Sequence, residues 1–373
     1  MKRLLAAALA AGSLLCQVPT AQAVGTSASS AILMDAESGR VLYEQNAHEE
    51  RLIASITKLM TALVALESGH PLEEKVTVRE EDTRTEGSSL YLRSGEELRL
   101  ETLLYGLLLQ SGNDAALAVA RHCGGTVENF VAEMNRRAAR LGMTNSSFAN
   151  PSGLNAEGHC STARDLALLA RACLKNETLA AIASTRSVTL EGRSFVNHNK
   201  LLWRYEGCVG LKTGYTEKAG RTLVSAAERD GMTLIAVTLD DPDDWRDHAA
   251  LFDWGFSNWK IETAVRAGEE ICSLPVGGSL VPFCPVRAGA DLHWPLREGE
   301  RLEFRLDLHM EQLTAPVQKG VRIGTLRGAV GAGWRDPAGV RGGGPQGSGG
   351  APEGPVPAAD GPSERALNKK EAA

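Results

Sequence analysis

Patterns typical of β-strands stand on both sides of a long helical stretch, and this order constrains the fold more than any other feature of the chain. Residues 31–46 predict two strands around a turn at 35–39, because both flanks are rich in β-forming residues. Three further runs of this kind, at 207–214, 221–228 and 232–240, are separated by turns that contain Gly or Asp. A sheet built from both ends of the chain predicts one α+β domain.

The residues between these strands have the apolar periodicity of helices. We expect helices over 55–66, 101–110, 114–123, 127–141 and 161–174, and a closing helix over 244–256. Thr126 is expected to cap the fourth helix, and Ser161 or Thr162 the fifth, because a hydroxyl oxygen can accept a hydrogen bond from an unpaired backbone N–H. Gly69 and Gly142 are expected to end the first and fourth helices.

The N-terminus has the pattern of a secretory signal. Residues 1–23 begin with Lys2 and Arg3, continue with an apolar run too short to span a bilayer, and end in a small-x-small cleavage pattern at 21–23. We expect cleavage after Ala23 and therefore an exported, extracytoplasmic protein. A short N-terminal membrane anchor is the alternative.

The C-terminal third differs from the residues before it in its strand pattern and in its Gly and Pro content. Residues 261–330 alternate short strand patterns with turns, which predicts a small all-β domain after a first domain over 24–260. Residues 331–373 are rich in Gly and Pro and poor in apolar residues, so we expect them to be disordered. This tail has no apolar stripe and does not support membrane anchoring.

Charge and cysteine content exclude some function classes. Loss of Lys2 and Arg3 leaves 38 of the 40 basic residues against 46 acidic ones, a net charge of −8, which does not favour nucleic-acid binding. If Cys16 leaves with the signal, six cysteines remain without a Cys-x-x-Cys pair, so we expect no metal site and no cofactor. Cys272 and Cys284, which are close in sequence, could form a disulfide, and free thiols are the open alternative.

Three short polar motifs are the candidates for chemistry. Ser55 and Lys58 lie three residues apart at the start of the first expected helix and should share one face. Ser111 and Asn113 lie in a polar break between two apolar helices, and residues 212–214, Lys-Thr-Gly, end a strand. Each motif alone is compatible with an ordinary cap, helix turn or strand end. Their occurrence together, in this order, favours a catalytic site.

With their flanks, these motifs resemble the serine-type D-alanyl-D-alanine carboxypeptidases, the low-molecular-mass penicillin-binding proteins of peptidase family S11. The resemblance runs from about residue 30 to about residue 330 and includes SITKLMTALVAL, LLLQSGNDAA, FANPSGL, GLKTGYT and WGF. It implies a β-lactamase/transpeptidase-like domain, in which an antiparallel sheet carries a helical subdomain, followed by the small all-β domain.

The residue types fit acyl transfer to a serine. A Ser hydroxyl is a poor nucleophile until a base accepts its proton, and the eight His residues form no Ser-His-Asp pattern. Lys58 can be that base if burial and the nearby cation Lys212 keep its amine neutral. The backbone N–H of Ser55 is expected to help bind the oxyanion. The resemblance implies that the N–H of Tyr215 is the second donor.

The remaining motif residues are expected to bind substrate. Ser111 is placed to relay a proton to the leaving group, and Asn113 can hold the substrate amide by donating and accepting hydrogen bonds. Lys212 and the Thr213 hydroxyl, next to Gly214, are the first candidates for the free carboxylate of the substrate.

A second cation could bind the same carboxylate. The resemblance implies an arginine in the helix before Trp254-Gly255-Phe256, and Arg246 matches that position. The open alternative is a surface ion pair of Arg246 with Asp243 or Asp247.

The resemblance implies removal of the terminal D-Ala from peptidoglycan stem peptides ending in D-Ala-D-Ala, through an acyl-serine that β-lactam antibiotics also form. A DD-endopeptidase or a β-lactamase of the same superfamily is an alternative, although residues 144–160 contain no clear base for fast deacylation. A catalytically lapsed wall-binding protein is an alternative of another class, and the intact motifs argue against it.

Overall fold

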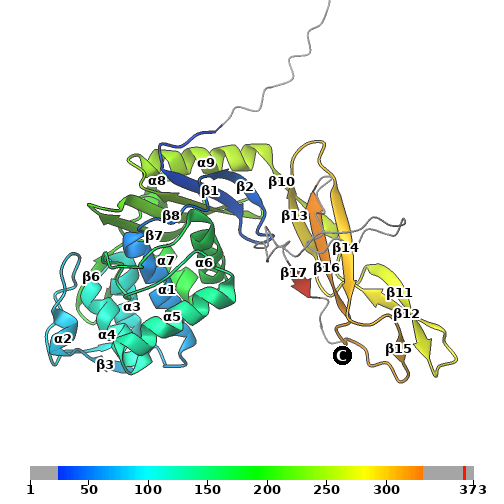
Figure 1. Ribbon diagram of the computed structural model, residues 1–373, viewed down its shortest axis with the longest axis horizontal. Helices are drawn as coiled ribbons and strands as arrows, with labels where there is room; N and C mark the ends of the chain where they lie inside the picture. The colour runs from blue at the N-terminus through cyan, green and yellow to red at the C-terminus, as the bar shows by residue number, and fades with distance from the viewer. Residues whose placement is uncertain (1–23, 331–363, 367–373) are drawn as a thin grey trace, which may run out of the picture.

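The computed structural model describes residues 24–330 and 364–366. The expected signal peptide and its cleavage site after Ala23 lie outside the described residues. So does the expected disordered tail, except for Glu364–Ala366, which form the short strand β17. Two lobes are visible in Figure 1: an α+β domain and a strand-rich domain that follows it in sequence.

The first domain is organised around a five-stranded antiparallel sheet with the order β2-β1-β9-β8-β7. Its strands are β1 (Ser30–Asp35), β2 (Val41–Gln45), β7 (Cys208–Thr216), β8 (Gly220–Arg229) and β9 (Met232–Leu239). Ile32 of β1 is paired with Val237 of β9, so strands from the two ends of the domain are neighbours, as the sequence predicted. β7 forms one edge of the sheet.

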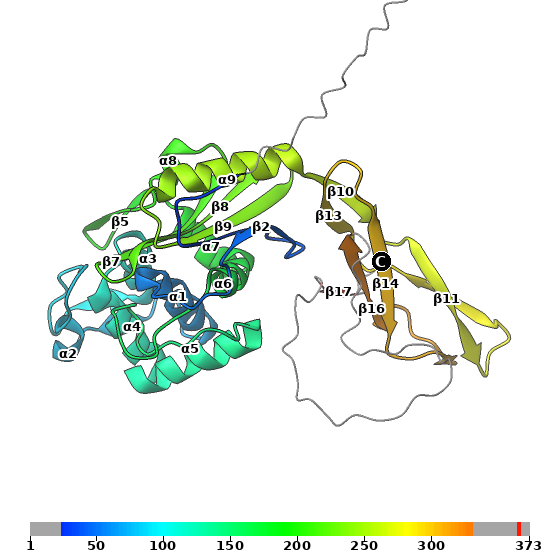
Figure 2. The same ribbon diagram turned by 45° about the horizontal axis from the view of Figure 1, so that its top comes forward.

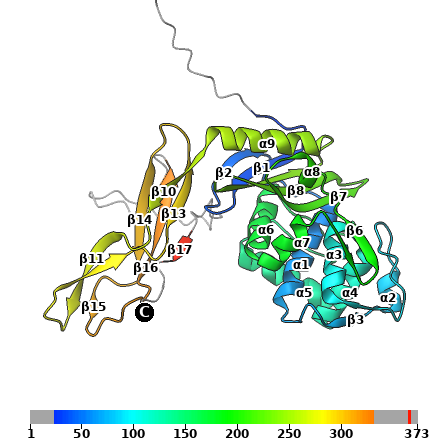
Figure 3. The same ribbon diagram turned by 180° about the vertical axis from the view of Figure 1, so that it is seen from behind.

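Helices cover both faces of this sheet (Figures 1 and 3). Ile32 and Met34 of β1 belong to the core on the side of the helical subdomain, whereas Leu33 belongs to the core under α9 (Asp244–Asn258). This alternation follows from the period of two in a strand. The subdomain contains α1 (Thr57–Glu67), α2 (Glu80–Thr83), α3 (Leu100–Leu109), α4 (Asn113–Gly124), α5 (Val127–Leu141), α6 (Ala163–Lys175) and α7 (Glu177–Ser184), and α8 (Leu201–Arg204) precedes β7.

The ends of the helices agree with the sequence in most places. The hydroxyl oxygens of Thr126 and Thr162 accept hydrogen bonds from backbone N–H groups at the starts of α5 and α6. The first helix differs, because it begins as the 3₁₀ turn Ala54–Ile56 and Ser55 makes no capping hydrogen bond. The sequence did not indicate α7, nor the hairpins β3 (Lys75–Thr77) with β4 (Glu97–Arg99) and β5 (Ser187–Leu190) with β6 (Arg193–Val196).

The second domain consists of short strands around its own apolar core, which includes Val265, Leu274 and Trp294. Its strands are β10 (Lys260–Val265), β11 (Glu270–Gly277), β12 (Phe283–Arg287), β13 (Leu292–Leu296), β14 (Leu302–Leu308), β15 (Leu313–Thr314) and β16 (Gly324–Val330). β17 pairs with β16. Of the two alternatives left open for Cys272 and Cys284, the structure has free thiols: the two residues lie on paired strands but are out of register.

Two contacts join the domains where α9 leads into β10 (Figure 2). Arg40, between β1 and β2, forms an ion pair with Glu300 at 2.6 Å and donates a hydrogen bond to the carbonyl oxygen of Pro295 at 2.5 Å. The guanidinium of Arg297 lies 3.8 Å from the ring centroid of Trp259. Among the described residues, no helix has both the length and the apolar character needed to cross a membrane.

Candidate active site

The 3₁₀ turn before α1 presents Ser55 in a conformation that its neighbours hold in place. Ala54 has a φ of +47°, a left-handed conformation that costs free energy in a residue other than Gly. The Thr57 hydroxyl donates to the Ala54 carbonyl oxygen at 2.9 Å and lies 2.8 Å from Nε2 of His159. Nδ1 of His159 accepts from the backbone N–H of Ala149. A neutral His159 therefore carries its proton on Nε2 and donates it to Thr57.

The loop 150–153 presses against the same turn. Gly153 has a φ of +87°, and a Cβ atom there would lie 1.9 Å from the Ala54 carbonyl oxygen, so only Gly fits. The Asn150 side chain accepts hydrogen bonds from the backbone N–H groups of Ser152 and Gly153 and fixes this loop. The backbone on both sides of Ser55 is thus held by contacts from distant parts of the sequence.

Lys58 is fully buried one helical turn after Ser55. Its Nζ atom lies 2.7 Å from Oδ1 of Asn113, 2.5 Å from the carbonyl oxygen of Ser152 and 2.9 Å from Oγ of Ser55. The first two oxygens can only accept hydrogen bonds, so they take two N–H groups of the amine. A neutral amine then directs its lone pair at the Ser55 hydroxyl, which can donate. This is the arrangement of a base and a nucleophile.

Burial sets the charge of this amine. Removal from water lowers the pKa of Lys58 well below its ordinary value, the charge of Lys212 lowers it further, and Asp114 opposes both effects. Burial also lowers the pKa of Lys212, to about 7. Repulsion between the two amines favours the loss of one proton, and the charge of Lys212 is one cause of the lowered pKa of Lys58. A neutral Lys58 beside a charged Lys212 is the state in which the Lys58 amine can accept the Ser55 proton.

The break between α3 and α4 brings the second motif to this amine. Ser111 is buried, has a φ of +63° and directly follows the last turn of α3. Asn113 is the first residue of α4, where its Nδ2 donates to the carbonyl oxygen of Glu86 at 2.7 Å. Asn113 is therefore held from one side by Glu86 while it accepts from Lys58 on the other.

The third motif lies on the edge strand β7. A Cβ atom on Gly214 would lie 3.0 Å from the backbone nitrogen of Ser55 and 2.5 Å from Oγ1 of Thr222, so the strand approaches the nucleophile closely because this residue is Gly. Nζ of Lys212 is buried and donates to the carbonyl oxygen of Thr213 at 2.9 Å. Tyr215, whose N–H is expected to be an oxyanion donor, follows directly and has an exposed side chain.

The family model of the D-alanyl-D-alanine carboxypeptidases, peptidase S11, matches residues 17–243 of this chain, which include all three motifs. The chain belongs to this family. A D-alanyl-D-alanine carboxypeptidase of Bacillus subtilis is 33% identical over 349 residues, or 87% of this chain and 90% of the relative. The predicted family membership is therefore confirmed.

Solved structures of family relatives have the same architecture. Penicillin-binding protein 5 of Haemophilus influenzae matches 83% of this chain and 95% of its own with a TM-score of 0.73 and 30% identity. A variant of the Streptomyces K15 DD-transpeptidase matches 63% of this chain and 100% of its own with a TM-score of 0.61 and 31% identity. The predicted α+β, transpeptidase-like fold with a strand-rich C-terminal domain is therefore confirmed.

In this member of the family, Arg246 lies at the start of α9 and is engaged with carboxylates. It forms ion pairs with Asp243 at 2.8 Å and Asp247 at 3.2 Å, and its side chain is 68% exposed. The alternative left open by the sequence, a surface ion pair, is therefore present. The substrate-binding role of Arg246 stays a prediction.

A second arginine lies on β8, the strand paired with the Lys-Thr-Gly strand. Arg221 on β8 is paired in register with Tyr215, two residues after Thr213. Its guanidinium forms a salt bridge to Asp244 at 2.7 Å and lies over the ring of Trp245. Sequence analysis missed Arg221, because its position depends on the register of the β7–β8 hairpin. The contact of His159 with Thr57 could not be predicted either, since it joins residues far apart in sequence.

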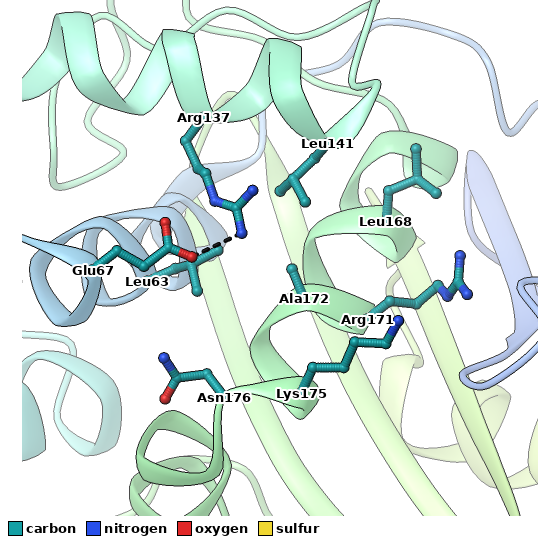
Figure 4. A pocket seen from close by; sticks show the side chains of 9 residues that line it. All are labelled: Leu63, Glu67, Arg137, Leu141, Leu168, Arg171, Ala172, Lys175 and Asn176. Carbon is teal, nitrogen blue, oxygen red and sulfur yellow. Dashed lines mark hydrogen bonds and ion pairs between the residues drawn. The ribbon is translucent and has the colours of Figure 1, made fainter. Parts of the chain in front are cut away.

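A separate hollow lies at the far end of α1, between α1, α5 and α6 (Figure 4). The ion pair between Glu67 and Arg137, at 2.7 Å, spans part of it. The hollow is lined by Leu63, Glu67, Arg137, Leu141, Leu168, Arg171, Ala172, Lys175 and Asn176. None of these residues belongs to the three motifs, so this hollow is not the site around Ser55.

Proposed function

We propose that the protein is a serine-type DD-carboxypeptidase that removes the terminal D-Ala from peptidoglycan stem peptides through an acyl-enzyme on Ser55. The observation that carries this proposal is the environment of Lys58: two carbonyl oxygens take two of its N–H groups, and the remaining direction points at the Ser55 hydroxyl 2.9 Å away. Family membership supports the same reaction.

The acylation step follows from these positions. Oγ of Ser55 attacks the carbonyl carbon of the penultimate D-Ala while its proton passes to Nζ of Lys58. The backbone N–H groups of Ser55 and Tyr215 stabilise the oxyanion that forms. The C–N bond then breaks, and the terminal D-Ala leaves with a proton that Ser111 relays from Lys58.

Water completes the turnover. It attacks the acyl carbon, gives a proton to Lys58 and releases the shortened peptide, while Ser55 regains its hydroxyl proton. A β-lactam enters by the same first step, since opening of its strained amide acylates Ser55. We also propose that the protein is exported to the cell-wall side of the membrane. The residues of the expected signal peptide lie outside the described range.

The edge of the sheet supplies the binding surface for the substrate. Within the described residues no strand pairs with the outer edge of β7, so an extended peptide can add to it through main-chain hydrogen bonds. Asn113 holds the substrate amide, and Lys212 with Thr213 and Gly214 receives the terminal carboxylate. Arg221 or Arg246 adds a second positive charge, and Arg221 is favoured by its register opposite Tyr215.

The test is release of D-alanine from an N-acylated peptide ending in D-Ala-D-Ala, by protein starting at Val24, with Ser55→Ala beside it. Release by the wild type alone supports the proposal. A folded wild-type protein that forms a penicillin adduct but releases no D-alanine would favour an endopeptidase acting on cross-links. Rapid turnover of penicillin would favour a β-lactamase. Neither release nor adduct would overturn the assignment.

A further inference from the structure

Three side chains converge at the opposite end of the helical subdomain from Ser55. His70 and Glu74 lie in the segment after α1, and His122 lies in the last turn of α4. Nδ1 of His70 is 2.8 Å from one oxygen of the Glu74 carboxylate, and Nε2 of His122 is 3.4 Å from the other. The three donor atoms lie within 4.8 Å of one another.

We propose that His70, Glu74 and His122 bind a Zn²⁺ ion that ties the end of α1 to the end of α4. Two imidazoles and one carboxylate are a ligand set that zinc accepts, and a fourth, tetrahedral position is left for water. Metal–ligand distances of about 2.0–2.2 Å place tetrahedral donor atoms about 3.3 Å apart. The 2.8 Å and 3.4 Å distances are to different oxygens of Glu74, so with one carboxylate oxygen as ligand the three donor atoms, now within 4.8 Å of one another, need to close in by small side-chain rotations.

The state of His122 argues for a ligand beyond the three side chains. Its ring is 16% exposed, and its buried Nε2 atom lies 3.4 Å from the Glu74 carboxylate without the geometry of a hydrogen bond. A buried polar atom without a partner costs free energy. The two imidazole rings also lie close together, with their centroids 4.7 Å apart. A cation between the two nitrogens and the carboxylate satisfies all three groups.

The helix termini favour a cation at the same place. α1 ends at Glu67, three residues before His70, and α4 ends at Gly124, two residues after His122. The carbonyl ends of helices carry partial negative charge, which stabilises a positive ion close to them. The zinc ion would therefore lie where two helix dipoles and one carboxylate all favour positive charge.

The role of this ion is structural and independent of the proposed reaction. α1 carries Lys58 at its first turn and α4 begins with Asn113, so the two helices that present the proposed base and its partner also meet at the cluster. The nine residues that follow Lys58 up to the end of α1 at Glu67 span about 14 Å at 1.5 Å each, and the cluster lies beyond that end. The zinc would fix the relative position of the helices and would not contact substrate.

The test is a titration of metal-free full-length protein with Zn²⁺, followed by calorimetry and by the midpoint of thermal unfolding. We expect one equivalent to bind and to raise the midpoint. Glu74→Gln and His122→Asn should each weaken binding by at least about 100-fold. Loss of a residue that only hydrogen-bonds to a metal ligand costs about 10–100-fold in affinity, and loss of the ligand itself should cost more. His309→Asn, a change to an exposed imidazole in the other domain, should leave binding unchanged.

Two further variants test whether zinc binds at the three proposed ligands and independently of the proposed reaction. Cys123→Ser tests whether the thiol next to His122 binds the metal instead, and we expect no loss of affinity. Ser55→Ala should bind zinc as the wild type does, which separates this proposal from that of the reaction. Absence of stoichiometric binding, or equal binding by Glu74→Gln and the wild type, would overturn the zinc site.

Discussion

The ionisable side chains at the two ends of the helix pair α1 and α4 differ in how deeply they are buried. At their starts, Lys58 is fully buried and its partners are neutral oxygen atoms, so its amine loses charge. At their ends, His70 and Glu74 are about one-third exposed, so water can solvate the charge of the Glu74 carboxylate. The difference shows that burial, and not the presence of ionisable groups, makes one end suited to proton transfer and the other to binding a cation.

The largest expected effect is at the buried end. Lys58→Arg places a guanidinium, which does not give up its proton at ordinary pH, beside Ser55. Loss of a general base costs about 10²–10⁴ in rate, and we expect kcat/KM for D-alanine release to fall by that amount. Lys75→Arg, the same change at an exposed residue, should have wild-type activity. If penicillin still acylates Ser55 in Lys58→Arg, Lys58 is not the base, and the comparison of the two helix ends does not explain proton transfer.

The next effect concerns the backbone beside the nucleophile. Gly153→Ala puts a methyl group against the Ala54 carbonyl oxygen and should displace the turn that carries Ser55. A displacement of about 1 Å can cost about 10²-fold in rate, so we expect kcat to fall by that factor in a folded protein.

Gly158→Ala is the matched control, because this residue also has a positive φ but no atom lies within 4 Å of the added Cβ. It should lose some stability and keep its activity. Equal loss of activity in both variants would mean that the conformation of the loop, and not contact with Ala54, supports the site.

A smaller effect on KM should distinguish the roles of Arg221 and Arg246. A hydrogen bond to a charged group contributes about 1.5–3 kcal/mol, or about 10–100-fold in binding. Arg221→Gln should therefore raise KM for a peptide with a free C-terminal carboxylate by about 10-fold or more, and Arg246→Gln should change it little. The reverse order would restore Arg246 as the carboxylate ligand. A substrate with an amidated C-terminus should be insensitive to both changes.

The smallest expected effect is a difference between the pH dependence of kcat/KM and that of kcat. Activity needs Lys58 neutral, so kcat/KM should rise with pH as that amine, whose pKa is lowered by burial, loses its proton. It should fall again above pH 7 as Lys212, with a pKa of about 7, loses the charge that binds the carboxylate. Bound substrate stabilises the Lys212 cation, so the fall in kcat should begin at higher pH. A falling limb at the same pH in both profiles would contradict this role of Lys212.

The sequence was informative where local pattern decides structure. The five strands of the main sheet, the caps at Thr126 and Thr162 and the three motifs were all visible, because each depends on neighbouring residues. The chemistry of Lys58 could be predicted in outline from its spacing to Ser55. Its contact with the Ser152 carbonyl oxygen could not, since it depends on a loop about ninety residues away.

Features that depend on register or on distant contacts stayed hidden. Arg221 becomes a candidate only when β8 is aligned with β7, and His159 only when its loop is folded against Thr57. The cluster at the ends of the helices has one local pair, His70 and Glu74, but its third member is far away in sequence. The sequence therefore gave no reason to expect a metal there.

The pairing of β1 with β9 has a consequence for how the enzyme matures. Residues 30–35 pair with β2 on one side but find their other partner only in residues 234–239, so the sheet closes after most of the domain has been synthesised. Contacts between such distant segments are slow to form, because a long loop must close first. A shortened chain that ends before β9 would contain Ser55 and Lys58 and still lack the sheet that buries them. The sheet beside the proposed nucleophile is therefore complete only in a chain that includes β9.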